Sequence, residues 1–103
     1  MDSDIDALAQ HLDEAAALLR KYENFHWADW LTTDARLIRN LDFYGITHLR
    51  SALGGMGSLN DVILAQPSPE NRAVQIASQD DSRFQVLLGE IWALSRKLVD
   101  AER

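Results

Sequence analysis

Apolar side chains recur along both ends of the chain at the spacing of α-helices. In the first segment they follow one another at intervals of three or four residues, as Ile5, Leu8, Leu12, Ala15, Leu19 and Tyr22. In the last segment the same intervals separate Phe84, Leu87, Ile91, Leu94 and Leu98. Such spacing puts each set on one face of a helix. We therefore predict long helices over about residues 4–23 and 81–101, the second one starting from caps in the polar run 79–82.

Two shorter helices are predicted between these long ones. The first follows Asn24, a candidate cap, and runs to about residue 40, with one face formed by Trp27, Leu31, Asp34, Ile38 and Leu41. A separate helix capped by Thr33 is an alternative, because Thr32 and Thr33 lower helix propensity. The second helix is capped by Asp42 and ends near Leu53. Gly45 inside it indicates either a close helix contact or a helix that begins later.

The stretch from Gly54 to Asp61 is rich in glycine and precedes another helix start. Gly54 or Gly55 can end one helix, Gly57 allows a tight turn, and Ser58 can cap a short helix over about residues 59–65 that stops before Pro67 and Pro69. This interpretation makes the stretch a structural elbow. Two alternatives stay open: Asn60 and Asp61 face a protein partner, or the loop amides bind an anion. Residues 70–78 form either a short helix or an ordered connection.

These elements predict an all-α fold. We expect a single domain over residues 1–103, built as a small bundle of about five helices with long first and last helices and the glycine-rich elbow in the middle. The length of 103 residues suffices for one core without disulfides or metals.

Composition excludes several classes of function. The chain has no cysteine, which removes thiol nucleophiles, disulfide scaffolds and cysteine-ligated zinc. Its formal net charge is −6, and its ten basic residues are scattered, so nucleic-acid binding is not expected. If the chain has a macromolecular partner, a basic protein is favoured; the alternative is that the negative surface only keeps the protein soluble. No apolar run approaches the roughly 18 residues of a membrane span, and the chain starts with acidic rather than basic residues, so we expect a cytoplasmic protein that does not bind membranes.

Candidate catalytic or metal-binding residues are few. His11 and Glu14 lie one helical turn apart, but a di-metal bundle needs a second such pair, and we predict no metal, no cofactor and no catalytic residue. Trp27 is expected in the core. For Trp30 a core position and an exposed recognition position stay open, since tryptophan is common at binding hot spots.

A resemblance connects these motifs. The segment from Trp27 to Leu64, with Trp27-Ala28-Asp29-Trp30-Leu31, Asp42 to Gly45 and the octapeptide Gly-Gly-Met-Gly-Ser-Leu-Asn-Asp, resembles a family of small bacterial domains of unknown function. The resemblance implies no enzymatic activity. Small acidic proteins of this kind are similar, as a class, to immunity proteins that neutralise a toxin by binding it.

The resulting hypothesis is a non-enzymatic bacterial binding protein that occludes a basic toxin domain. Its tentative partner-binding residues are Trp30, Asp42, Asn60 and Asp61. A regulatory domain that binds a small ligand or an anion at the glycine-rich loop is an alternative. A structural subunit of a homo-oligomer is another.

Overall fold

A computed structural model describes residues 3–53 and 71–101, with side chains of the last segment described from residue 79 onward. These residues form four helices, and none of them lies in a strand. The helices are α1 (Ser3–Lys21), α2 (Phe25–Arg39), α3 (Tyr44–Ala52) and α4 (Asn71–Ala101). The predicted all-α class is confirmed. The described ranges contain four helices rather than five, because the helix predicted at 59–65 falls outside them.

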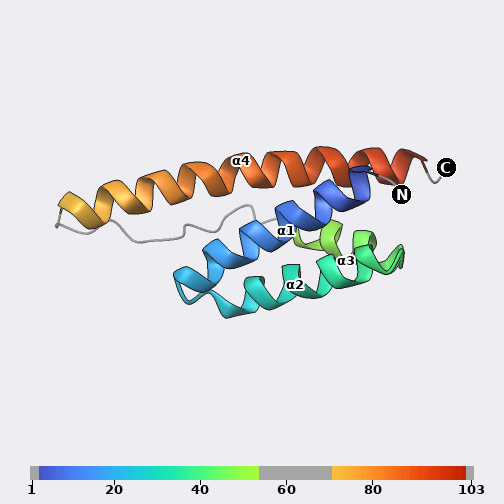
Figure 1. Ribbon diagram of the computed structural model, residues 1–103, viewed down its shortest axis with the longest axis horizontal. Coiled ribbons are helices and arrows are strands. Elements are labelled where there is room, and N and C mark those ends of the chain that lie inside the picture. The colour runs from blue at the N-terminus through green and yellow to red at the C-terminus, as the bar shows by residue number, and fades with distance from the viewer. Residues whose placement is uncertain (1–2, 54–70, 102–103) are drawn as a thin grey trace.

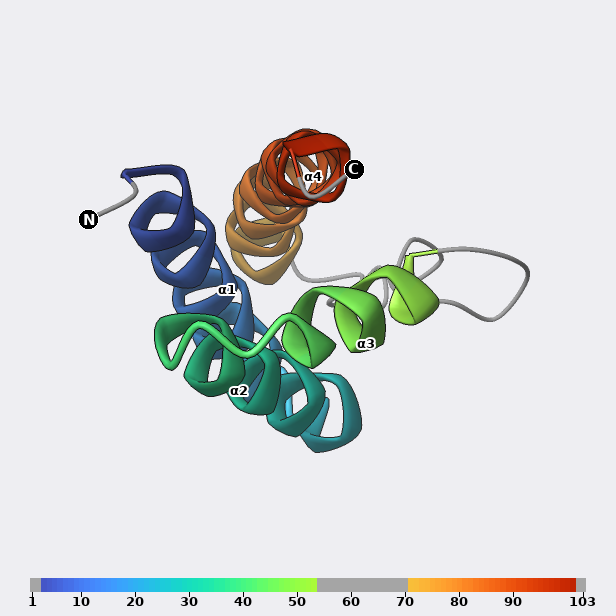
Figure 2. The same ribbon diagram turned by 90° about the vertical axis from the view of Figure 1, so that its right-hand side faces the viewer.

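The four helices enclose one core, as seen along the long axis in Figure 2. Helix α1 packs against α2 and α4, α2 packs against α3, and α3 contacts α4, so the contacts close into a ring. The fully buried side chains come from all four helices, with Leu12, Leu31, Leu49 and Phe84 as examples. Burying each such side chain stabilises the fold by about 1.5 to 3 kcal/mol, and this face is the one that the apolar spacing predicts.

Helix α4 extends along the whole length of the molecule in Figure 1. The predicted start near residue 81 is wrong, because α4 is continuous from Asn71 to Ala101. The polar residues 79–82 do not cap a new helix. They form one helical turn within the continuous helix α4. Asp80 in this turn accepts hydrogen bonds from Lys21 Nζ (2.7 Å) and from Tyr22 Oη (2.6 Å), at the end of α1. A run of polar residues inside a helix thus serves contacts between helices.

Three salt bridges and one histidine–carboxylate contact connect one side of α1 to α4 along the length of the two helices. From one end to the other they join Asp4 to Lys97 (2.9 Å), His11 to Glu90 (3.0 Å), Glu14 to Arg83 (2.5 Å) and Asp80 to Lys21 (2.7 Å). The residue numbers rise on one helix as they fall on the other, so α1 and α4 are antiparallel. His11 and Glu14, considered above as metal ligands, each pair with a different residue of α4.

Helices α1 and α2 both end with a residue in the left-handed backbone conformation. Glu23 and Leu41 each have φ of 60°. The backbone N–H groups of Glu23 and of Asn24 donate to Arg20 O and Leu19 O, and those of Leu41 and Asp42 donate in the same way to Ile38 O and Leu37 O. This is the Schellman arrangement, in which glycine is the usual left-handed residue. Both chain reversals in the described residues therefore use a residue with a Cβ.

Gly45 allows α3 to approach α2 closely. A Cβ at Gly45 would lie 2.8 Å from Leu37 Cβ and 3.2 Å from Asp34 O. Helix α3 begins at Tyr44, one residue later than a helix capped by Asp42 would, so Gly45 lies in its first turn. Both explanations of this glycine are confirmed. Helix α2 continues through Thr32, whose hydroxyl donates to Ala28 O (2.8 Å), so there is no separate helix after Thr33.

No helix in the described parts of the chain combines the length and the apolar character needed to cross a bilayer.

Candidate functional site

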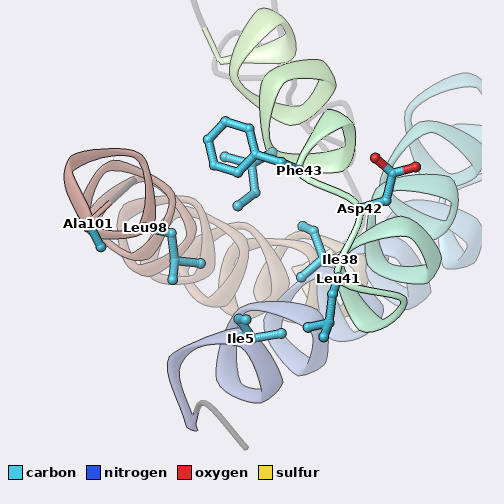
Figure 3. A pocket seen from close by; sticks show the side chains of 8 residues that line it. Ile5, Ile38, Leu41, Asp42, Phe43, Leu98 and Ala101 are labelled. Carbon is cyan, nitrogen blue, oxygen red and sulfur yellow. The ribbon is translucent and has the colours of Figure 1, made fainter. Parts of the chain in front are cut away.

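An apolar pocket lies where the turn from α2 to α3 meets the first turn of α1 and the last turns of α4. Figure 3 shows this pocket, which we call the corner pocket. Its volume is about 300 Å³. The residues that line it are Ile5, Ile38, Leu41, Asp42, Phe43, Ile46, Leu98 and Ala101. All but one of these are apolar, and they come from all four helices and the turn, so the pocket exists only in the assembled bundle.

Leu41 is the most unusual residue of the corner pocket. Its side chain is 74% exposed, the largest exposed fraction of any large apolar side chain in the described residues, and its φ is 60°. A left-handed conformation costs roughly 1 to 2 kcal/mol for a residue with a Cβ. An exposed leucine gains little from burial to offset that cost. Strain of this kind concentrates at functional positions, where it presents a side chain that folding alone does not need.

Leu41 belongs to a run of exposed apolar side chains. Phe43 is 40% exposed and Tyr44 is 62% exposed. In Figure 3 the Phe43 ring reaches across toward α4, while Leu41 lies beside Ile38 and Ile5. The side chains of the turn thus flank the pocket on two sides. Leu41 was predicted on the buried face of the preceding helix, and this prediction is wrong, because the Schellman turn ends α2 at Arg39 and turns the next residues outward.

Asp42, one of the predicted partner-binding residues, lies on the rim of this pocket. Its Oδ1 accepts the backbone N–H of Tyr44 (3.0 Å), the first residue of α3, although the N-cap itself is Phe43, one residue after the predicted cap. In Figure 3 the carboxylate points away from the apolar side chains. Asp42 therefore holds the turn in shape and also adds negative charge beside an apolar surface.

The charged residues around the corner pocket are predominantly acidic. The two basic residues next to lining residues are both paired, Arg39 with Asp13 (2.6 Å) and Lys97 with Asp4 (2.9 Å). Among the described carboxylates that line the pocket or adjoin its lining residues in the sequence, Asp6, Asp42 and Asp100 form no ion pair. Among the described residues, carboxylates therefore outnumber cations here by three, since Arg39 and Lys97 are each matched by one acid.

A second cluster of polar and aromatic side chains joins α2 to α3 behind the corner. Asp34 is fully buried, and its Oδ1 lies 2.5 Å from Nδ1 of His48. Burial raises the pKa of Asp34 to about 6, and the hydrogen bond with His48 moderates that rise. A buried carboxylate paired with an imidazole ties the two helices together at the level of Gly45. In the sequence, the position of Asp34 on the apolar face of the predicted helix was the signal for this buried contact.

Trp30 is part of this cluster. Its ring stacks on His48 with centroids 4.0 Å apart and an angle of 11° between the planes. Trp30 and Trp27 are both partly buried against the core, and their rings lie 5.2 Å apart. Of the two positions predicted for Trp30, in the core or exposed for recognition, the contacts agree better with the first. Trp30 is partly buried and packs against His48 of α3. The structure does not bring Trp30 together with Asp42 into one site.

Trp92 is the most exposed of the three tryptophans. Its side chain is 41% exposed, and the guanidinium of Arg50 lies 5.1 Å from its ring centroid. Together with Leu53, Gln85, Leu88 and Gly89 it lines a second hollow between α3 and α4. Leu53, one of the residues that line this hollow, is the last described residue of the first segment.

The remaining predicted site residues lie outside the described residues. These are the elbow residues Gly54, Gly55, Gly57 and Ser58 and the partner-binding candidates Asn60 and Asp61. Within the described parts of the chain, no cluster of three or more His, Asp or Glu side chains could hold a metal ion. The sequence did not identify Leu41 and Phe43 as residues of the corner pocket. Glycine marks a left-handed turn in a sequence, whereas a leucine in the same conformation gives no such signal.

The geometry defines the class of protein first: an all-helical domain with an exposed, acid-rimmed apolar corner. Residues 20–69 of this chain match a family described as a domain of unknown function (DUF6966). That range includes α2, α3 and the Leu41 turn, while Ile5 and Leu98 of the corner pocket lie outside it. The predicted resemblance to an uncharacterised domain family is thus supported for the middle of the chain. No curated protein and no solved structure matches the sequence.

Proposed function

We propose that this protein is a non-enzymatic binding protein and that its corner pocket is where it contacts a protein partner. The observation that carries the proposal is Leu41, a strained leucine that is 74% exposed beside an apolar pocket. A fold that needed only a chain reversal there would be more stable with glycine. Retaining leucine makes sense when the side chain is buried by something else, as are apolar anchors at protein interfaces.

The form of this function that we favour is immunity: binding and occluding a cognate toxin in the bacterial cytoplasm. Three observations support it. The chain has a net charge of −6, the described residues around the corner pocket carry an acidic excess, and residues 20–69 match a domain family of unknown function. Electrostatic attraction between an acidic protein and a basic toxin would accelerate association and make it sensitive to salt.

The experiment is co-expression with the product of the adjacent gene, followed by a binding measurement with the two purified proteins. We expect a complex at low salt and protection of cells that express the partner. The decisive comparison is between Leu41→Gly and Glu23→Gly. Both variants replace a left-handed residue of a Schellman turn by glycine, but only Leu41 belongs to the corner pocket.

Burying an exposed leucine contributes about 1.5 to 3 kcal/mol, so Leu41→Gly should weaken the complex by roughly 10- to 150-fold. Glu23→Gly should leave the affinity within about two-fold of the original protein. Absence of both a complex and protection would refute immunity. Equal affinity of the Leu41→Gly variant and the original protein would remove the corner pocket from the interface.

A further inference from the structure

We propose that the corner pocket recognises a partner segment in which one large apolar side chain is flanked by lysine or arginine. This inference rests on the proposed function and specifies the chemistry of the partner. It follows from two properties of this surface. The apolar lining favours an apolar side chain of the partner, and the acidic surroundings favour basic residues beside that side chain.

The apolar requirement comes from the pocket itself. Its inner wall consists of branched aliphatic side chains, with Ile5, Ile38 and Leu98 from three different helices. None of them offers a hydrogen bond, and the carboxylate of Asp42 points away from the apolar side chains (Figure 3). A polar group inserted there would lose its water without gaining a partner, which is costly. The inserted group is therefore an apolar side chain such as phenylalanine or leucine.

The basic requirement comes from the rim. Asp42 lines the pocket from the turn, and the exposed residues Asp6 and Asp100 directly follow and precede the lining residues Ile5 and Ala101 in the sequence, on α1 and α4. The neighbouring cations, Arg39 and Lys97, are already paired with other acids. Cationic groups on both sides of an inserted apolar side chain would meet unmatched carboxylates. Acidic groups in the same places would be repelled.

The same charge argument separates this occupant from a second copy of the chain. In a symmetric dimer the corner of one copy would face the corner of the other, because such interfaces use the same surface on both subunits. The acidic excess that the described residues give one corner would then be opposed to an identical excess. A basic segment of a different protein matches both the lining and the rim, whereas a second copy matches only the lining.

The test is an NMR titration of the isotope-labelled protein at low salt with three synthetic peptides. The first has one phenylalanine between pairs of lysines, the second has the phenylalanine between pairs of glutamates, and the third has alanine between pairs of lysines. We expect shifts of the amide signals of Leu41, Phe43 and Ile5 with the first peptide. Its affinity should exceed that of the alanine peptide by about 10-fold or more, and high salt should weaken it.

Two double variants with the same change in net charge serve as matched proteins. Asp6→Asn with Asp100→Asn removes charge at the corner and leaves the hydrogen bond from Tyr44 to Asp42 intact. Glu23→Gln with Asp29→Asn removes charge near the α1–α2 turn, at the other end of α1. The first pair should weaken binding of the lysine–phenylalanine peptide by roughly two- to thirty-fold, and the second pair by less than two-fold.

Equal affinity for the lysine and glutamate peptides would overturn the inference and leave the proposed function in place, since the pocket would still bind an apolar side chain. Shifts confined to other residues, or no shifts at all, would also overturn it. Shifts of Leu41 and Phe43 that depend on protein concentration without peptide would assign the pocket to a second copy. The complex with the adjacent gene product tests the proposed function independently of all three results.

Discussion

Replacing Gly45 by alanine tests whether α2 and α3 are packed as closely as described. The added Cβ would lie 2.8 Å from Leu37 Cβ, an atom attached directly to the backbone that can move only if the helix moves. Overpacking of this kind costs about 1 to 3 kcal/mol, and the gain in helix propensity, at most about 1 kcal/mol, offsets part of it. We expect Gly45→Ala to destabilise the protein by about 1 to 2 kcal/mol.

The measurement is thermal and urea unfolding, with Gly89→Ala as the matched control. Gly89 lies inside α4, and no atom outside its own helical turn lies within 4 Å of the Cβ position. The same substitution there should stabilise by about 0.5 to 1 kcal/mol. At about 4 to 8 °C per kcal/mol for a domain of this size, the two variants should move the melting temperature in opposite directions. A stabilising Gly45→Ala would refute the close approach of α3 to α2.

Three further predictions concern the turns and the titrating groups. We expect Leu41→Gly and Glu23→Gly each to stabilise by about 0.5 kcal/mol in urea unfolding, because relief of a left-handed residue outweighs the entropy of glycine in the unfolded chain; destabilisation of both would contradict the assigned turns. The pKa of Asp34 is raised to about 6, above its unfolded value of about 3.9, so its contribution to stability is full below about pH 4 and is lost as the pH rises through about 6. The original protein should therefore lose stability relative to Asp34→Asn between about pH 4 and 6, and parallel pH profiles would count against a buried carboxylate. The hydrogen bond to Asp80 raises the pKa of Tyr22 to about 12, so Asp80→Asn should lower the midpoint of tyrosinate absorbance toward about 10, and an unchanged midpoint would exclude the contact.

The helical periodicity predicted most of the fold, because each helix hides one apolar face. The long first helix, the helix after Asn24 and the helix after Asp42 all begin and end within a few residues of their predicted bounds. The start of the last helix was missed for a physical reason. Asp80 and Asp81 have the chemistry of helix caps, and a sequence cannot show that Asp80 instead meets Lys21 and Tyr22 of a distant segment.

The candidate site was much harder to predict than the fold. Leu41 continues the apolar spacing of the preceding helix, so its sequence position indicates burial, and only the backbone conformation turns it outward. Asp42 was predicted as the cap of α3, and the prediction is one residue off, because Phe43 is the N-cap; the Asp42 carboxylate still accepts the first N–H of the helix, as an aspartate before a helix commonly does. Ile5 and Leu98 were assigned to the core, and nothing local to them indicates that they also line a pocket.

The corner pocket joins parts of the chain that are far apart in sequence, with Ile5 near one end, Leu98 near the other and Leu41 between them. A fragment cut at residues 20 and 69 would keep the turn and lose two of the walls. Binding studies on such a fragment would therefore report on an isolated leucine rather than on the pocket. Because α1 and α4 both border the pocket, a search for its partner needs a protein in which both helices are intact.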